Sequence, residues 1–365
     1  MNALRDHIAA VIAADGPLTI GGYMSLALGH PEFGYYMRRD PFGVSGDFIT
    51  APEISQIFGE LIGLWCVQSW LDMGAPDSFA LVELGPGRGT LMADILRAAA
   101  LRPAFCAAAQ IHLVETSPAL RAVQQQALSG HPVQWHAGVD ALPALPCLIV
   151  ANEFFDALPI RQFEYRDGKW HERMVVHCDD RGFIVELAPQ PVADTALLRL
   201  DQRCGAIEQG AVAEVSLAAQ TVCEMLATHI SHYGGAALLI DYGPARSAFG
   251  DSFQAMQAHQ FVSPFVTPGD ADLTAHVDFA ALALAATTAG ALVDGPVTQA
   301  DFLKELGIEY RAAALSQKLD PEARAAMAET VKRLIGPEQM GQLFKVLAMR
   351  APALSERPGF SMAQR

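Results

Sequence analysis

Three alternating glycines beside an acidic residue carry the clearest chemical signal in this chain. The apolar stretch 79–84 reads as a buried strand that contains Glu83 and runs directly into Gly85, Gly87 and Gly89, with a helix expected next. Glycine tolerates positive φ and lets the backbone approach a ligand closely. The N-terminus of the following helix offers unpaired N–H groups and partial positive charge. The turn therefore predicts a site for a ligand that bears a carboxylate or a phosphate.

The spacing of these glycines separates two nucleotide-binding families. The dinucleotide fingerprint G-x-G-x-x-G would need a glycine at position 90, which is Thr90, whereas the third glycine stands at 89. The pattern acid-apolar-G-x-G-x-G instead resembles motif I of class I S-adenosylmethionine (SAM) methyltransferases. Thr90 is expected to cap the helix over 91–100. A purely structural glycine turn is the alternative interpretation.

A second acidic residue follows a second apolar strand. Residues 111–115 end in Glu115, and Ser117 with Pro118 offers a cap and a first-turn proline for the next helix. A carboxylate at the end of the second strand of a βαβ unit can accept hydrogen bonds from both ribose hydroxyls. Glu115 is therefore predicted to bind the ribose of SAM. The alternative is a solvated residue at a strand end.

Polar residues also follow the fourth apolar strand, 147–151. Strands one and four flank the topological switch point, where ligands of doubly wound sheets bind. Asn152 can donate and accept hydrogen bonds at once, and Glu153 and Asp156 can hold a guanidinium bidentately. We predict these three as the catalytic residues, with Asn152 also contacting the cofactor. The alternative is that Asn152 and Asp156 satisfy backbone groups of the loop.

The run from Asn152 to Pro159 resembles the hallmark of the MidA-like SAM-dependent methyltransferases. Further segments resemble the same family, namely 34–36, 46–55, 58–60, 240–243 and 272–279. The resemblance covers nearly the whole chain and implies SAM as cofactor and S-adenosylhomocysteine (SAH) as product. This family includes a mitochondrial complex I assembly factor that methylates a protein arginine. The resemblance therefore implies a protein partner with an arginine-bearing segment.

The segment 46–55 supplies two further acidic candidates. Asp47 or Glu53 is expected near the methionine amine of SAM or near a substrate guanidinium. A simpler interpretation exists for part of the segment, because Thr50 and Glu53 have the spacing of a capping box. In that interpretation Pro52 lies in the first turn of the helix that follows.

Three more residues complete the predicted site. Asp140 lies in the loop expected near the adenine, and Tyr242, at the end of strand five, is expected to line the substrate site. His276 is a further substrate-binding candidate, for which a helix-capping or loop role is the alternative. With Asp278 it could form a His–Asp pair, but no nucleophile elbow accompanies that pair.

Composition narrows the classes of function. The chain carries 25 basic and 40 acidic residues, a formal net charge of −15. This balance argues against nucleic-acid binding and suits either a basic partner or simple solubility. Six scattered cysteines without a C-x-x-C pair predict neither a metal site nor a disulfide framework. Without a signal-peptide layout or an apolar run that could span a bilayer, we predict a cytoplasmic protein.

The elements that must position these residues alternate strands with helices. Residues 1–75 read as a helical extension packing over the cofactor site, and residues 76–365 as the methyltransferase domain. Near-continuous apolar strands predict a parallel sheet covered on both faces. We expect strands at 79–84, 111–115, 132–136, 147–151, 236–241, 291–298 and 342–348. The expected fold is α/β, a Rossmann-like class I SAM methyltransferase sheet.

A large insert separates strands four and five of this sheet. It covers about residues 160–233, far more than a normal crossover. Alternation and turn residues predict a β-meander over 161–187, and the stretch 194–232 is expected to be helical.

The residues and the resemblance together predict a SAM-dependent methyltransferase, and the resemblance implies that its acceptor is an arginine of a protein partner. Two alternatives stay open. One is a respiratory-complex assembly or interaction factor with a regulatory SAM site, and the other is a small-molecule methyltransferase whose insert forms a substrate lid. The sequence contains no feature that predicts the oligomeric state.

Overall fold

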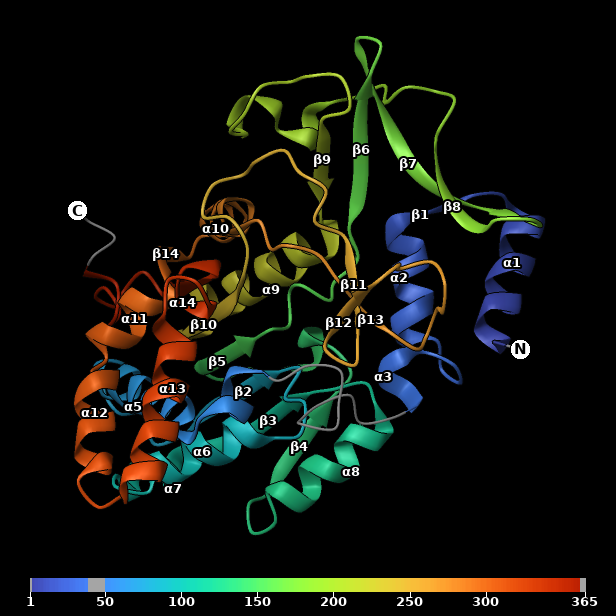
Figure 1. Ribbon diagram of the computed structural model, residues 1–365. Helices are drawn as coiled ribbons and strands as arrows, with labels where there is room; N and C mark the ends of the chain where they lie inside the picture. The colour runs from blue at the N-terminus through green and yellow to red at the C-terminus, as the bar shows by residue number, and fades with distance from the viewer. Residues whose placement is uncertain (1, 39–49, 362–365) are drawn as a thin grey trace. The chain divides into compact units, whose positions relative to one another are not determined.

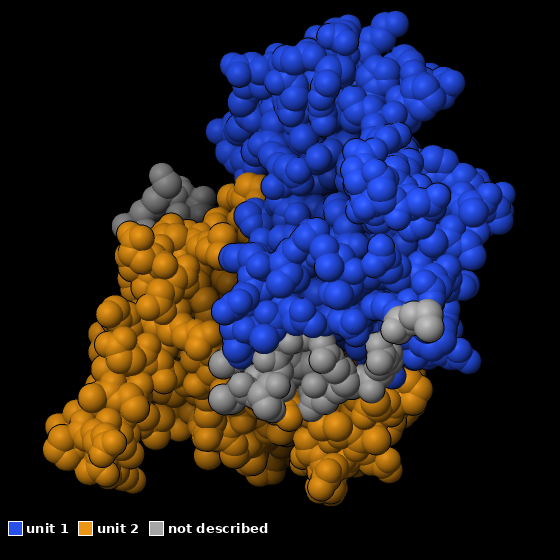
Figure 2. All heavy atoms as spheres, turned by 45° about the vertical axis from the view of Figure 1, so that its right-hand side comes forward, with its two compact units in different colours: residues 1–48, 156–221, 246–278 blue, residues 49–155, 222–245, 279–365 orange. Residues whose placement is uncertain are grey.

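The chain divides into two compact units, each assembled from three separate segments. The computed structural model describes residues 2–38 and 50–361. Unit 1 comprises residues 1–48, 156–221 and 246–278, and unit 2 comprises residues 49–155, 222–245 and 279–365. Figure 2 colours unit 1 blue and unit 2 orange.

Unit 2 is built on one mixed sheet, whose order among the described residues is β14-β15-β10-β5-β2-β3-β4 (Figure 1). Neighbours from β4 to β10 run parallel, whereas β15 is antiparallel to both β10 and β14. The strands are β2 (Phe79–Leu84), β3 (Ala109–Val114), β4 (Val133–His136), β5 (Cys147–Asn152), β10 (Gly235–Tyr242), β14 (Leu292–Thr298) and β15 (Phe344–Arg350). This arrangement confirms the predicted Rossmann-like class I methyltransferase sheet.

The register of the central strands brings the predicted ligand-binding residues to one edge. Every residue of β2 and of β5 is buried, as expected for parallel strands covered on both faces. Leu84 pairs with Val114 on one side and with Ala151 on the other. The glycine turn therefore lies at the carboxyl edge of the sheet together with Glu115 and Asn152. Doubly wound folds bind ligands at this edge.

The helices of unit 2 cover this sheet, and two of them pack unusually closely. An added Cβ at Gly59 in α5 would lie 2.4 Å from Cβ of Asp94 in α6, and one at Gly63 would lie 3.0 Å from Ile95. These glycines let α5 approach α6. The helices are α4 (Ala51–Ile54), α5 (Gln56–Asp72), α6 (Thr90–Ala99), α7 (Pro103–Ala108), α8 (Pro118–Ala127), α10 (Phe279–Thr288), α11 (Gln299–Glu305), α12 (Ile308–Ser316), α13 (Pro321–Ile335) and α14 (Met340–Leu343).

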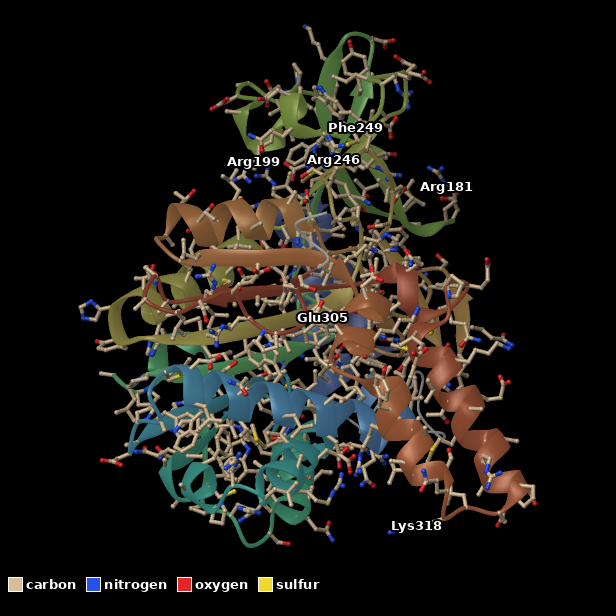
Figure 3. The ribbon with its side chains drawn as sticks, turned by 90° about the vertical axis from the view of Figure 1, so that its left-hand side faces the viewer. Arg181, Arg199, Arg246, Phe249, Glu305 and Lys318 are labelled. Carbon is tan, nitrogen blue, oxygen red and sulfur yellow. The ribbon has the colours of Figure 1, made fainter. Side chains whose placement is uncertain are left out.

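The carboxyl-terminal segment of unit 2 is tied to α11. Glu305, labelled in Figure 3, accepts the backbone N–H of Gly359 at 3.1 Å and the hydroxyl of Ser361 at 2.8 Å. Phe360 is completely buried and its ring lies 5.5 Å from that of Phe302. This segment therefore belongs to the core of unit 2.

Unit 1 combines amino-terminal helices with two small sheets. The larger sheet has the order β1-β7-β6-β9, with β8 also paired to β7, and the smaller has the order β12-β11-β13. Its strands are β1 (Leu18–Thr19), β6 (Arg161–Arg166), β7 (Lys169–Cys178), β8 (Gly182–Leu187), β9 (Val212–Val215), β11 (Gln254–Gln257), β12 (Gln260–Val262) and β13 (Asp272–Thr274). Its helices are α1 (Ala3–Asp15), α2 (Ile20–Gly29) and α3 (Tyr35–Arg38), while α9 (Leu217–Tyr233) belongs partly to each unit. The predicted β-meander over 161–187 is confirmed as β6, β7 and β8.

The observed grouping differs from the predicted division at residue 75. Leu18 of β1 pairs with Val175 of β7, so the first helices join the insert in unit 1. Helix α5, in contrast, packs against α6 and against β5 and β10, so it joins unit 2. A division read along the chain misses this, because segments far apart in sequence share one core.

Three predictions about the elements were wrong. The stretch 194–232 is not continuously helical, because Val212 of β9 pairs with Glu164 of β6 and only α9 follows as a long helix. Strand two ends at Val114 rather than at Glu115, and the last strand is displaced to 344–350. The sheet formed by β11, β12 and β13 was not foreseen, because strands of three or four residues leave little periodicity.

Within the described ranges, no helix has the length and apolar character needed to cross a bilayer. The same residues contain no group of three or more His, Cys, Asp or Glu side chains arranged to hold a metal ion.

Candidate functional site

The glycine turn after β2 has a conformation that requires glycine. Gly85, Gly87 and Gly89 have φ values of 59°, 52° and 81°, all in the left-handed region. A Cβ on Gly85 would lie 2.9 Å from the ring of Phe154, which leaves no room for a side chain. The prediction that Thr90 caps the next helix was wrong, because Gly89 is the N-cap residue and α6 begins at Thr90.

Glu83 lies in β2 just before this turn and is 3 % exposed. Burial raises its pKa well above the ordinary value, while a hydrogen bond from the backbone N–H of Met92 in α6 opposes that rise. Its Oε2 has no hydrogen-bond partner among the described residues. Glu83 therefore joins the strand to α6 and keeps one oxygen as an available acceptor or, when protonated, as a donor.

Glu115 follows β3 directly and is 8 % exposed. Its Oε1 accepts the backbone N–H of Ser117 at 2.7 Å, and its Oε2 accepts from Nε2 of Gln124 at 3.2 Å. Burial raises its pKa, and the hydrogen bonds from Ser117 and Gln124 oppose the rise. Each carboxylate oxygen has a second lone pair, so these contacts orient the group without exhausting its acceptor capacity.

Asp140 lies in the short 3-10 helix Val139–Ala141 that follows β4, and it is exposed. Its Oδ1 would lie 2.6 Å from a Cβ added to Gly138, so this loop is also closely folded on itself. The prediction that it contacts the adenine stays a prediction.

The loop after β5 is held against β10. The N–H of Glu153 donates to the carbonyl of Ile240 at 2.9 Å, and the N–H of Phe155 donates to Oδ2 of Asp241 at 3.0 Å. Asn152 donates from Nδ2 to Oε1 of Glu153 at 3.0 Å. Its own Oδ1 is buried and has no partner within the described part of the chain. Asn152 thus presents a buried acceptor at the carboxyl edge of the sheet.

A short helix, α4, connects this loop with the glycine turn. The N–H of Ala51, its first residue, donates to Oε1 of Glu153 at 3.0 Å. Glu53 in the same helix accepts the hydroxyl of Thr90 at 2.5 Å and lies 3.9 Å from the guanidinium of Arg88. Two of the predicted carboxylates, Glu53 and Glu153, are therefore attached to one helical turn beside motif I.

The alternative interpretation of Thr50 and Glu53 as a capping box is confirmed only in part. Thr50 is the N-cap residue of α4 and Pro52 lies in its first turn, but the Thr50 side chain makes no capping hydrogen bond. The backbone N–H of Glu53 donates to the carbonyl of Thr50 instead, and the carboxylate of Glu53 accepts from Thr90. The helix also breaks at Ser55, whose hydroxyl accepts the N–H of Ile57 and caps α5. Asp47, the other acidic candidate of this segment, lies outside the described residues.

Asp156 and His276 belong to unit 1. The carbonyl of Asp156 accepts the N–H of Ala275 at 3.0 Å, and its side chain is 6 % exposed. Burial, followed by the charges of Asp272 and Asp156, raises the pKa of Tyr36. His276 is exposed, and its N–H donates to the hydroxyl of Ser252 at 2.9 Å. The hydroxyl of Tyr36 donates to Oδ1 of Asp272 at 2.7 Å, and Asp156 lies close enough for its charge to act on the same hydroxyl.

Tyr242 ends β10 in unit 2, where its ring lies 5.4 Å from that of Phe344 and packs against the main core. Its neighbour Asp241 was not singled out by sequence, yet it is 1 % exposed and accepts the N–H groups of Phe155 and Tyr242. An acidic residue at the end of an apolar strand, the signal that identified Glu115, would have found it.

These residues fit SAM as cofactor. The buried acceptor atoms of Asn152 and Glu83, together with the carboxylate of Glu115, suit the amine and ribose hydroxyl donors of SAM. The N-terminus of α6 and the left-handed glycines suit its carboxylate.

Comparison with known proteins points to the same chemistry. The family model described as "Putative S-adenosyl-L-methionine-dependent methyltransferase" matches residues 61–297. A Danio rerio protein named "Protein arginine methyltransferase NDUFAF7, mitochondrial" is 37% identical over 374 residues, covering 95% of this chain and 86% of that protein. The Homo sapiens protein of the same name is 35% identical over 371 residues, covering 94% and 82%. A crystal structure from Burkholderia thailandensis with bound S-adenosyl-homocysteine superposes with a TM-score of 0.84 at 29% identity, covering 98% of this chain and 94% of that one.

Proposed function

The chain belongs to the family of S-adenosyl-L-methionine-dependent methyltransferases, and from this premise we propose that it methylates an arginine side chain of a protein partner. The observation that carries the proposal is the attachment of Glu153 and Glu53 to α4, beside the glycine turn. Relatives named protein arginine methyltransferases, 35% and 37% identical over most of the chain, support it.

The cofactor part of the site holds and orients SAM. When bound, SAM supplies a methyl group on a positively charged sulfonium. Gly85, Gly87 and Gly89 allow the backbone to approach the amino-acid end, and Glu115 is the acceptor for the ribose. Asn152 offers its buried Oδ1 to a donor of the cofactor. Positioning of this kind accounts for much of the acceleration of a displacement reaction.

The acceptor part needs carboxylates because a guanidinium stays protonated at any ordinary pH. A carboxylate can hold its planar N–H groups bidentately and offset its charge. Transfer replaces one N–H proton of arginine by a methyl group, so a carboxylate bonded to that N–H is placed to take the proton. In this proposal Glu153 fills that role, and Glu53 and Asp156 are the next candidates.

Replacing Glu153 tests the proposal directly. Glu153→Gln keeps the size of the side chain but removes its charge, so SAH affinity should change little. Methyl transfer from labelled SAM into protein should fall on the order of 10²-fold, the scale of losing one preorganised electrostatic contact. Glu338→Gln, on an exposed residue, is the matched control. Full transfer by the Glu153 variant would remove this residue from the acceptor site.

The acceptor itself can be identified with cell lysate. Incubation with labelled SAM should place the label in protein, and amino-acid analysis should recover it as methylarginine. Label that enters only small molecules would contradict a protein acceptor.

We further propose that the partner is a respiratory-complex protein, because the family resemblance implies one. We also propose that the reaction is cytoplasmic, because scattered cysteines suit a reducing compartment. Mass spectrometry of the labelled band and cell fractionation test these two proposals separately. A labelled band outside the respiratory complexes would contradict the first.

A further inference from the structure

Gln124 is a completely buried polar residue of α8 that no sequence motif singled out. Its amide nitrogen Nε2 donates to the carbonyl oxygen of Gly87 at 2.8 Å and to Oε2 of Glu115 at 3.2 Å. Its amide oxygen accepts from Nε1 of Trp135 in β4 at 2.9 Å. One side chain thus joins the glycine turn after β2, the carboxylate of Glu115 after β3, and β4.

We propose that Gln124 is a positioning residue for the cofactor, which sets the distance between the glycine turn and the ribose-binding carboxylate of Glu115. This rests on the cofactor site of the proposed function, and it adds a residue that contacts no ligand itself. An amide has two N–H donors in one plane, and here each serves a different ligand-binding segment. A buried bond of this kind is not weakened by competing water.

Trp135 determines which way the amide points. An indole N–H can only donate, so it must meet the amide oxygen and leave the nitrogen toward Gly87 and Glu115. The opposite orientation would place an oxygen against two acceptors and a nitrogen against a donor. Trp135 is itself placed by pairing with Leu113 of β3, the strand that ends just before Glu115.

Packing reinforces the same connection. A Cβ on Gly89 would lie 3.6 Å from Cα and Cγ of Gln124 and 3.6 Å from Cβ of Ala127. A side chain added at Gly89 would therefore meet α8 at ordinary van der Waals distance, so this helix lies close to the glycine turn. The hydrogen bond from Gln124 also opposes the rise in the pKa of Glu115 that burial causes, which favours the charged acceptor.

The test is SAH binding measured by calorimetry, which needs no methyl acceptor and so does not depend on whether arginine is the substrate. Gln124→Met keeps the volume but removes both donors, and the dissociation constant for SAH should rise about 10- to 100-fold. The number of sites per protein should stay near that of the wild type. A merely structural role would instead lower the binding-competent fraction and leave the dissociation constant unchanged. Gln125→Met, at the exposed neighbouring position, is the matched control and should bind normally.

A double-mutant cycle asks whether the residue acts through Glu115. In a Glu115→Ala background, Gln124→Met should cause a smaller loss of SAH affinity than it does alone. Gln124→Glu is the second variant if the first fails to fold. It keeps the shape of the side chain and the bond from Trp135, but it turns an oxygen toward the two acceptors, Gly87 and Glu115. It too should weaken SAH binding. Wild-type affinity in either Gln124 variant, or an equal loss in both backgrounds, would overturn the proposal. Failure of the wild-type protein to bind SAH would overturn the cofactor assignment and this proposal with it.

Discussion

Glu153 adopts a left-handed backbone conformation, with φ of 51°, which residues other than glycine rarely take. Contacts at both ends hold it there, since its N–H bonds to Ile240 and its carboxylate accepts from Ala51 and Asn152. Such strain is roughly 1–3 kcal/mol and persists mainly where neighbouring contacts enforce it, often at functional sites. The backbone therefore supports Glu153 as the first choice for the acceptor carboxylate.

Gly85→Ala should lower stability and SAH binding more than Gly74→Ala. Both glycines are left-handed, with φ of 59° and 83°, so a side chain adds about 1–2 kcal/mol of strain at either position. Only at Gly85 does the new Cβ also meet the ring of Phe154, whereas nothing lies within 4 Å of it at Gly74. Denaturant unfolding and SAH calorimetry measure the two effects. Equal losses in both variants would contradict the close approach at Gly85.

Glu115→Ala should weaken SAH binding by about 1.5–3 kcal/mol, the contribution of a charge-assisted hydrogen bond. The melting temperature should also fall modestly, because Ser117 and Gln124 lose their acceptor. Calorimetry and thermal unfolding separate the two effects. If the variant binds SAH normally, Glu115 does not hold the ribose and serves only as the acceptor for Ser117 and Gln124.

At the scale of elements, one carboxylate joins three helices of unit 2. Glu60 in α5 accepts from Gln56 in the same helix, from Arg97 in α6 and from Arg311 in α12, each at 2.8 Å. Burial alone would raise its pKa, but the hydrogen bonds from Arg311, Gln56 and Arg97 lower the pKa of Glu60 to about 2. Because α6 begins at the glycine turn, this cluster supports the helix that follows that turn.

The lowered pKa predicts a specific dependence of stability on pH. The unfolded chain has a Glu60 pKa near 4.5 and takes up its proton first as the pH falls. The stabilisation is therefore complete above that value and is lost between about pH 4.5 and pH 2. The difference in melting temperature between the wild type and Glu60→Gln should be largest above about pH 5 and shrink toward pH 2. For Glu338→Gln, on an exposed residue, the difference should stay small throughout. A Glu60→Gln difference that does not vary with pH would contradict the prediction.

At the scale of the whole molecule, the six cysteines differ in burial according to where the chain packs them. All six are free thiols in the described structure: Cys66, Cys147 and Cys223 are buried, Cys178 and Cys204 are partly buried, and Cys106 is exposed. Burial raises the pKa of Cys147 to about 12, and burial followed by the nearby charge of Glu224 raises that of Cys223 to about 12. The thiolate is the reactive form, so burial protects these thiols from modification in two ways. It blocks access of a reagent, and it disfavours formation of the thiolate.

Alkylation of the native protein should therefore modify Cys106 first. Cys66, Cys147 and Cys223 should react only after unfolding, because both access and thiolate formation require it. Iodoacetamide labelling followed by mass spectrometry gives the order, and the same reaction in guanidinium chloride should modify all six. Rapid native labelling of Cys147 or Cys223 would mean that the packing around β5 or α9 differs from that described.

Two features of the candidate site could be predicted because their sequence signals are local. The glycine turn and Glu115 each follow a buried strand directly, and both lie where the pattern placed them. The division of the chain could not be predicted in the same way. Leu18 pairs with Val175, which lies far from it in the sequence, and no local pattern predicts such a pairing.

The sequence by itself determined the class I sheet, the glycine turn and the acidic residues at strand ends, because apolar periodicity and glycine spacing are properties of consecutive residues. Only the tertiary structure decided that Glu53 contacts Thr90 rather than capping its own helix, and that Gln124 joins Gly87 to Glu115. These contacts join residues distant in the chain. They form only when the packing of whole elements has already offset the entropy of closing the loops between them.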